Sequence, residues 1–393
     1  MLQSNIDDPT LAQAGALRIK WYREKMDVLR IFRERYERER PFRGKTFLVC
    51  MHCEPKAAVR TEVLLAGGAE KIVFVGNLGS TKPDTAAYLS ALPNVTVLAK
   101  KGDTLRDLEA SVAQAMREPY DLLMDNGASL LQRYWSCRGA WRPQGAIEET
   151  RSGRLILEKQ GISPDFPVLV IDDSPVKRLV ENETGVGQSV VDGFMRATSM
   201  LIGGKKILII GYGFCGLGIA QRFRALGACT MVYDTDPLRL LKAKIEGHAV
   251  GRLDELLPQA DVVLTVTGRF DVVGEREIRL MKDGAVLCNA GHYNMEIDVA
   301  RLREIAPSPQ TVQDGIEKYT LGEKTLYLLQ NANPINLASG AGNPLEIMEL
   351  GYALQLLSLE RIAAGGLPAG AQPLPDDVNS EACRICLWGA RDA

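Results

Sequence analysis

The chain has 393 residues, of which 46% are hydrophobic and 24% are charged, and its formal net charge is −2 at pH 7. This composition is typical of a globular protein, and the length predicts two or three domains. The balanced charge offers no electrostatic basis for binding nucleic acid or an anionic membrane, so we predict neither as a partner. The sequence contains neither a membrane-spanning apolar run nor a signal-peptide pattern at its start, which predicts a cytoplasmic protein.

The first half of the chain alternates short apolar segments with helical patterns. Strands are predicted at 46–50, 71–75, 95–99, 121–125 and 168–172. This alternation is typical of a mostly parallel sheet that is covered by helices on both faces.

A buried strand, a glycine-rich turn and a helix are predicted in the segment 206–218. Gly211, Gly213 and Gly216 have the G-x-G-x-x-G spacing of a dinucleotide site. The first glycine permits a tight turn, the second lets the backbone approach a pyrophosphate, and the third lets helix and strand pack closely. The start of the helix offers unpaired N–H groups to the phosphates.

The next predicted strand, 229–234, ends in Asp234, which follows the first glycine by about the 20 residues expected of such sites. A carboxylate at this point accepts hydrogen bonds from the adenosine ribose and repels a 2′-phosphate. We therefore predict NAD as the cofactor in preference to NADP. The alternative is a glycine turn in an unrelated α/β protein.

The remaining strands of this second series are predicted at 262–267, 285–289 and 325–330, and long helical patterns at 188–202 and 344–364 flank the series. The fold class is predicted to be α/β, with two Rossmann-like, doubly wound parallel-sheet domains joined by these two hinge helices. We expect a substrate-binding domain at 1–185 plus 344–393 and an NAD-binding Rossmann domain at 186–343. Because ligands bind beyond the carboxyl ends of parallel strands, His52, Asp125 and Asp172 are expected to face the cofactor across one cleft.

Two C-x-x-C spacings occur, at Cys50/Cys53 and at Cys383/Cys386. A four-thiolate zinc site is one interpretation of these pairs. The other is coincidence, because the two pairs lie far apart in the sequence and the first sits at a strand end. We predict no metal.

Motifs at the ends of the predicted strands resemble those of the S-adenosylhomocysteine hydrolase family. They follow the family's order over nearly the whole chain, and the matching segments are 51–56 (MHCEPK), 125–127 (DNG), 148–153 (EETRSG), 172–182, 291–298 and 335–344. The first has the His-x-Glu-x-Lys form of the shorter bacterial and archaeal members. Several ordered motifs are far more specific than the glycine turn alone.

The resemblance implies hydrolysis by transient oxidation. In this family, tightly held NAD oxidises the ribose 3′-hydroxyl to a ketone, which acidifies the C4′ proton. A base removes that proton, the 5′ substituent leaves by β-elimination, water adds to the double bond, and the hydride returns. The substrate implied is a purine nucleoside such as S-adenosylhomocysteine, and the assembly implied is a homo-oligomer, either a dimer or a tetramer.

The resemblance also assigns roles to individual residues. Lys177 contacts the 3′-oxygen with Glu181 as its acidic partner, Asp125 is the candidate C4′ base, and His52 and His292 act at the 5′ end. The implied substrate-binding residues are Glu54, Lys56, Glu149, Asn182, Tyr293 and Asn343. The implied cofactor-binding residues are Gly211, Gly213, Phe214, Cys215, Gly216, Asp234, Thr267, Gly268, Asn289 and Asn336. The third histidine, His248, is predicted to lie at the surface.

Several positions depart from the family pattern. Tyr293 replaces a Phe and Asn343 replaces a His at the gate that admits the substrate's amino-acid part, while Leu217 replaces a basic residue in the glycine turn. The gate changes indicate a different 5′ substituent or different water access. Ala128 removes a carboxylate from the family's Asp-Gly-Gly-Asp turn, and the family's tail Lys and Tyr, which reach a neighbouring NAD, have no counterpart.

Three alternative functions therefore stay open beside thioether hydrolysis. The first is a nucleoside dehydratase or lyase that uses the same hydride shuttle to expel water, which the altered gate motivates. The second is a non-catalytic NAD-binding regulator, which the changed cofactor contacts motivate. The third is a simple nucleoside 3′-dehydrogenase, which would consume NAD stoichiometrically.

Overall fold

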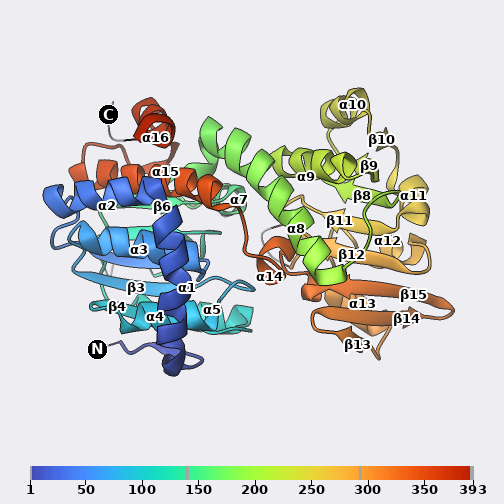
Figure 1. The fold of residues 1–393 in the computed structure, drawn as a ribbon, viewed down its shortest axis with the longest axis horizontal. Helices are drawn as coiled ribbons and strands as arrows, with labels where there is room; N and C mark the ends of the chain where they lie inside the picture. Colours follow the sequence, from blue (N-terminus) through green and yellow to red (C-terminus); the bar gives the residue numbers. More distant parts are fainter. Residues whose placement is uncertain (1, 138–140, 292–293, 390–393) are drawn as a thin grey trace. The chain divides into compact units, whose positions relative to one another are not determined.

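The computed structural model describes residues 2–137, 141–291 and 294–389. The chain forms two compact units, Met1–Lys177 with Leu345–Ala393, and Arg178–Pro344 (Figure 1). Within the described residues, every helix is too short or too polar to cross a membrane. Both units are α/β, as predicted.

The first unit is built on a sheet in which every pair of neighbouring strands is parallel. Its order is β1 (Asn5–Ile6), β4 (Val95–Ala99), β3 (Lys71–Gly76), β2 (Thr46–Met51), β5 (Leu122–Asp125), β6 (Gly145–Glu148), β7 (Pro167–Val170) and β16 (Gly370–Pro373). The chain order reverses between β2 and β5, which creates the switch point where doubly wound sheets bind their ligands. β2 ends just before His52, and β5 ends at Asp125.

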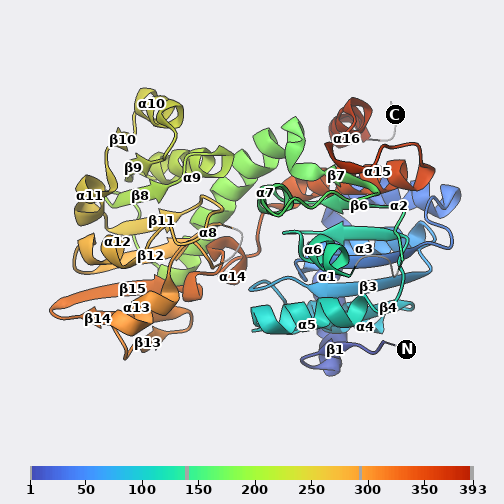
Figure 2. The same ribbon diagram turned by 180° about the vertical axis from the view of Figure 1, so that it is seen from behind.

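Helices cover both faces of this sheet. α5 (Leu105–Ala115), α6 (Ser129–Ser136) and α7 (Arg151–Lys159) pack on one face and share its apolar core (Figure 2). The other face carries α1 (Ala12–Lys25), α2 (Asp27–Glu39), α3 (Pro55–Ala66), α4 (Pro83–Ala91) and α15 (Leu345–Ala364), with α16 (Asp376–Trp388) beside α15. α3 therefore lies close to α15, although the two are far apart in the sequence.

The second unit has the strand order of a dinucleotide-binding sheet. The order is β10 (Ala249–Val250), β9 (Cys229–Tyr233), β8 (Lys206–Ile210), β11 (Val262–Thr265), β12 (Ala285–Asn289), β15 (Lys324–Leu329), β14 (Ile316–Leu321) and β13 (Gln310–Gln313). The strands from β10 to β15 are parallel, whereas β14 and β13 add an antiparallel edge. The predicted parallel sheet is therefore confirmed, and the antiparallel edge formed by β14 and β13 was not predicted.

Two apolar clusters fill the faces of the second sheet. α8 (Val186–Thr198), α9 (Phe214–Ala225) and α10 (Pro237–Ile245) contribute to one cluster. α11 (Leu253–Leu256), α12 (Glu275–Leu280) and α13 (Val299–Ile305) contribute to the other. The short helix α14 (Ile335–Ala338) packs on α8, where Gly193 allows the Ile335 carbonyl to approach closely.

The predicted strands all form, and the differences lie at their ends. The segment 168–172 ends early, because Ile171–Asp173 is a 3-10 turn. β6 was missed, since its four residues, Gly-Ala-Ile-Glu, carry too little apolar pattern to indicate a strand. Lys177–Gly185 forms a π-helix, which is a rare form of helix that often occurs at functional sites.

Candidate active site

His52 follows β2, and its ring is held by Ser80. The His52 Nδ1 atom lies 2.7 Å from the Ser80 hydroxyl oxygen, and that hydroxyl donates to the Asn77 carbonyl at 3.1 Å. The single hydroxyl proton is used on Asn77, so His52 carries its own proton on Nδ1, and Nε2 is the basic nitrogen. Burial lowers the pKa of His52 to about 4, so the ring is neutral at pH 7.

Glu54 and Lys56 begin helix α3 and form a buried ion pair. The Glu54 carboxylate caps the helix by accepting from the backbone N–H groups of Lys56 and Ala57, both at 3.1 Å. It also contacts the Lys56 ammonium at 2.8 Å and accepts from the Tyr352 hydroxyl at 3.0 Å. A carboxylate and an ammonium thus lie together two and four residues beyond His52. Their role as substrate contacts stays a prediction.

Asp125 and Glu148 are register partners on β5 and β6, and neither side chain is exposed. Burial raises the pKa of both carboxyl groups, and the charge of Glu148 adds to the rise at Asp125. Asp125 accepts from the backbone N–H groups of Asn126 and Leu131, at 3.0 and 2.9 Å. These contacts hold the turn that starts α6. The role of Asp125 as the C4′ base stays a prediction.

Glu148 fixes the same turn from the neighbouring strand. Its carboxylate accepts from the backbone N–H groups of Gly127, Ala128 and Thr150 at 2.8 to 2.9 Å. Gly153 lies directly against this carboxylate, and a Cβ atom there would approach the Glu148 carboxyl carbon to 2.2 Å. Glu148 was not predicted as a site residue, although it stands in the EETRSG motif.

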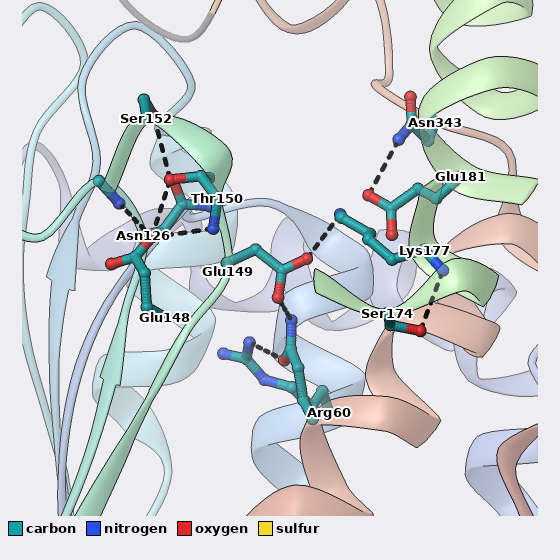
Figure 3. A network of polar contacts seen from close by, with 12 residues as sticks. Arg60, Asn126, Glu148, Glu149, Thr150, Ser152, Ser174, Lys177, Glu181 and Asn343 are labelled. Atoms are coloured by element: carbon teal, nitrogen blue, oxygen red, sulfur yellow. Dashed lines mark hydrogen bonds and ion pairs between the residues drawn. The ribbon is translucent and has the colours of Figure 1, made fainter. Parts of the chain in front are cut away.

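Lys177 and Glu149 form the central ion pair of the first unit. The Lys177 ammonium lies 2.6 Å from Glu149 Oε1, and the side chains of both residues are 7% exposed (Figure 3). The other carboxylate oxygen, Oε2, accepts from the Gln355 amide at 2.7 Å. Glu149 is therefore held at both oxygens, and sequence reasoning missed Gln355 because it stands 206 residues away along the chain.

Glu181, Asn343 and Asn336 are linked within the second unit. Asn343 donates to Glu181 Oε1 at 3.3 Å and accepts from the Ser189 hydroxyl at 2.8 Å. Asn336 in turn donates to the same hydroxyl at 3.2 Å. Ser189, which the sequence analysis did not single out, thus joins two of the predicted site residues. Asn182 is half-buried on the π-helix.

The glycine turn has the geometry that its spacing predicts. Gly211 has φ +107°, and a Cβ atom there would lie 2.8 Å from the Val266 carbonyl. Gly216 packs against the Gly211 carbonyl so closely that a Cβ atom would approach it to 2.0 Å. At Gly213, by contrast, an added Cβ atom would meet only the Arg239 guanidinium among the described residues, at 4.0 Å, so the turn is open where a pyrophosphate would approach. Phe214 and Cys215 form the first turn of α9 behind it.

Asp234 closes the glycine turn from the end of β9. Its carboxylate accepts from the Tyr212 backbone N–H at 2.7 Å and lies 3.4 Å from the Arg239 guanidinium. The carboxylate is buried, and Arg239 is partly exposed beside it. This arrangement fits the ribose of a dinucleotide at the carboxyl end of β9.

A buried carboxylate, Glu296, shapes the loop after β11. It accepts from the Thr267 backbone and hydroxyl, both at 2.8 Å, and from the Gly268 backbone at 2.7 Å.

Asn289, at the end of β12, is fully buried. Its side chain accepts from the Gly291 backbone N–H and donates to the Ala332 carbonyl. Its amide therefore braces neighbouring loops, and a direct contact with nicotinamide stays a prediction.

Three further predictions concern the remaining residues. His292 and Tyr293 lie outside the described residues. His248 was predicted to be at the surface, which is wrong: its side chain is buried, with Nδ1 2.6 Å from the Thr230 hydroxyl and the ring edge-on to Tyr212. Among the described residues, no three His, Cys, Asp or Glu side chains gather so as to hold a metal ion, and the cysteines form no disulfide.

Two parallel sheets, an open glycine turn with its acid, and a buried lysine–carboxylate pair define an NAD-binding enzyme of the α/β class. The sequence profile described as "S-adenosyl-L-homocysteine hydrolase" matches residues 3–205, and that described as "S-adenosyl-L-homocysteine hydrolase, NAD binding domain" matches residues 182–342. The chain belongs to the S-adenosyl-L-homocysteine hydrolase family, and its cofactor is NAD.

Curated relatives match over nearly the whole chain. The S-inosyl-L-homocysteine hydrolase of Methanopyrus kandleri is 38% identical, over 97% of this chain and 92% of its own. That of Methanosarcina mazei is 35% identical, over 96% and 93%. The adenosylhomocysteinase of Archaeoglobus fulgidus is 35% identical, over 95% and 93%.

Proposed function

We propose that the protein hydrolyses the 5′-thioether between a purine nucleoside and homocysteine, and that the 6-oxopurine form, S-inosyl-L-homocysteine, is its preferred substrate. The buried Lys177–Glu149 pair carries the proposal, because it sets an ammonium and a carboxylate where two ribose hydroxyls can be held. The names of the Methanopyrus and Methanosarcina relatives support the choice of base.

In the proposed reaction, the first unit binds the nucleoside and residues 186–343 bind NAD. Bound NAD supplies the reversible oxidation at C3′. Glu149 accepts a hydrogen bond from the 2′-hydroxyl. Lys177, in its neutral amine form, takes the proton of the 3′-hydroxyl and becomes the ammonium that Glu149 stabilises. Their 2.6 Å contact in a buried setting favours this arrangement, since electrostatic interactions are stronger where water is excluded.

At the 5′ end, His52 is proposed to act through Nε2. Elimination releases the thiolate before water adds, so a neutral imidazole can accept the proton of the water that adds at C5′ and pass it to the thiolate that has already left. The Ser80 contact keeps the ring in one tautomer, which supports this assignment.

The Glu54–Lys56 pair is proposed to recognise the purine base, because a 6-oxopurine presents an acceptor at O6 beside a donor at N1. The ammonium would then donate to O6 while the carboxylate accepts from N1–H.

The test is to give the NAD-loaded protein S-inosyl-L-homocysteine, S-adenosyl-L-homocysteine and inosine in separate reactions. Homocysteine is followed with a thiol reagent and nucleosides by mass. The proposal expects homocysteine from both thioethers, with the larger kcat/KM for the inosyl compound. Faster cleavage of the adenosyl compound would reject the choice of base. A dehydrated nucleoside without homocysteine would indicate the lyase instead.

A further inference from the structure

Arg60 is a buried guanidinium with an unusual lack of partners. It lies on α3, is 1% exposed, and donates through Nη1 to the Gln355 amide oxygen at 2.8 Å. Its Cζ atom lies 5.3 Å from the centre of the Tyr352 ring. Nε and Nη2 have no hydrogen-bond partner among the described residues, nor does any carboxylate there form an ion pair with Arg60. Burial lowers the pKa of Arg60.

A buried charge without a contacting counter-charge is costly, and an apolar side chain of similar size is often at least as stable. Arg60 is therefore not explained by its contribution to stability. Its only hydrogen bond among the described residues leads to Gln355, and the Gln355 amide donates in turn to Glu149. This series of hydrogen bonds connects Arg60 to the Glu149 carboxylate of the candidate site.

The path Arg60–Gln355–Glu149–Lys177 permits one amide orientation only. A guanidinium can only donate and an ionised carboxylate can only accept, so the oxygen of Gln355 must face Arg60 and its NH₂ must face Glu149. That NH₂ occupies Glu149 Oε2 at 2.7 Å, which leaves Oε1 to the Lys177 ammonium at 2.6 Å. With one donor on each oxygen, the rotation of the carboxylate is fixed.

We propose that Arg60 is a positioning residue for the reaction: by locking the Gln355 amide it fixes Glu149 and, through Glu149, the place of the Lys177 ammonium. The inference rests on the proposed function for the roles of Glu149 and Lys177. Without Arg60 the amide can turn over and present its oxygen to Glu149. The carboxylate then loses a donor, rotates, and no longer holds the ammonium in line with the 3′-hydroxyl.

The test uses purified NAD-loaded protein with the variants Arg60→Met, Arg60→Lys, Gln355→Met and the double variant Arg60→Met/Gln355→Met. The rates measured are NADH formation on adding the thioether and steady-state homocysteine release. A loss of alignment predicts that kcat falls roughly 10- to 100-fold in Arg60→Met while KM stays within about twofold. Arg60→Lys, which keeps a donor-only cation, should recover most of the rate.

The double variant separates a relay from two independent effects. If Arg60 acts only through Gln355, the double variant should be no slower than the Gln355→Met single variant, because interactions in one chain are not additive. Rate losses that multiply would overturn the inference, as would a wild-type rate in Arg60→Met. Arg30→Met removes an exposed arginine of α2 and is the matched control, with no change expected.

Two further experiments test the role of Arg60 if the first set of measurements cannot be made. If Arg60→Met does not fold, Gln355→Met breaks the same path from α15 and should give the same loss in kcat; an unchanged kcat there rejects the relay. If the wild-type protein releases no homocysteine, the proposed function fails, and crystal structures then decide the inference. A Glu149–Lys177 contact that is identical in wild type and Arg60→Met would overturn it, and a displaced carboxylate would support it.

Discussion

Ser80 accepts a hydrogen bond from the Nδ1–H group of His52 across 2.7 Å, because the Ser80 hydroxyl donates its own hydrogen to the Asn77 carbonyl. A serine hydroxyl, which could serve either as donor or as acceptor, is thereby made an acceptor toward the imidazole. The tautomer of His52 follows from this short relay rather than from a neighbouring carboxylate.

Replacing Ser80 by Ala should therefore slow the reaction without unfolding the protein. The ring loses its fixed tautomer and orientation, and we expect kcat to fall by about 10-fold or more, within the range typical of general acid–base catalysis. Homocysteine release measures the effect. Ser90→Ala on α4 is the control, because the Ser90 hydroxyl donates to the Ala87 carbonyl of its own helix. Equal rates in both variants would show that Ser80 does not orient His52.

The lowered pKa of His52 predicts how stability depends on pH. The folded chain holds this histidine neutral down to about pH 4, whereas in the unfolded chain it takes up a proton near pH 6.5. Between these values the unfolded state binds more protons, so the free energy of unfolding should decrease as the pH falls from about 6.5 to 4. Comparing urea denaturation of wild type and His52→Gln across this range isolates the contribution. Identical slopes would contradict the pKa assigned to His52.

The glycine turn offers a pair of substitutions with opposite expectations. In Gly211→Ala the new Cβ meets the Val266 carbonyl at 2.8 Å on a left-handed backbone, so the apo protein should lose stability. In Gly213→Ala the new Cβ enters open space, so thermal stability should stay close to wild type while the affinity for NAD falls. Differential scanning fluorimetry with and without NAD measures both quantities. Undiminished NAD binding by Gly213→Ala would place the pyrophosphate elsewhere.

Asp234 and Arg239 predict a change of cofactor preference. Asp234→Ala removes the carboxylate that would accept from the ribose and leaves Arg239, which lies 3.4 Å from it, beside a 2′-phosphate. Loss of a charged hydrogen bond costs about 1.5 to 3 kcal/mol, so NAD affinity should fall roughly 10- to 100-fold and NADP affinity should rise. Titration calorimetry with both cofactors checks this, with Asp254→Asn on α11, whose carboxylate pairs with the exposed Arg252, as control. A loss of both affinities in equal measure would reject the role of Asp234.

The strands, turns and helices that arise from local sequence patterns could be predicted from the sequence. Strand, turn and helix signals are local, which is why β2, β8 and the glycine turn were placed correctly. The contacts of Glu149 were not predictable, because its donor Gln355 is 206 residues away and Arg60 is 295 residues from Gln355. His248 was misplaced for a similar reason: the Thr230 hydroxyl that contacts it comes from β9, and the Tyr212 ring comes from the glycine turn.

The most direct test of the proposed oxidation and elimination is the fate of the hydrogen at C4′. The NAD-loaded protein is allowed to cleave S-inosyl-L-homocysteine in deuterium oxide, and the released nucleoside is analysed by mass and NMR. The account predicts deuterium at C4′, since that proton is removed and replaced in each turnover, and no cleavage by Lys177→Gln. Inosine that is released with its original C4′ hydrogen in place would show direct displacement at C5′ and contradict the account.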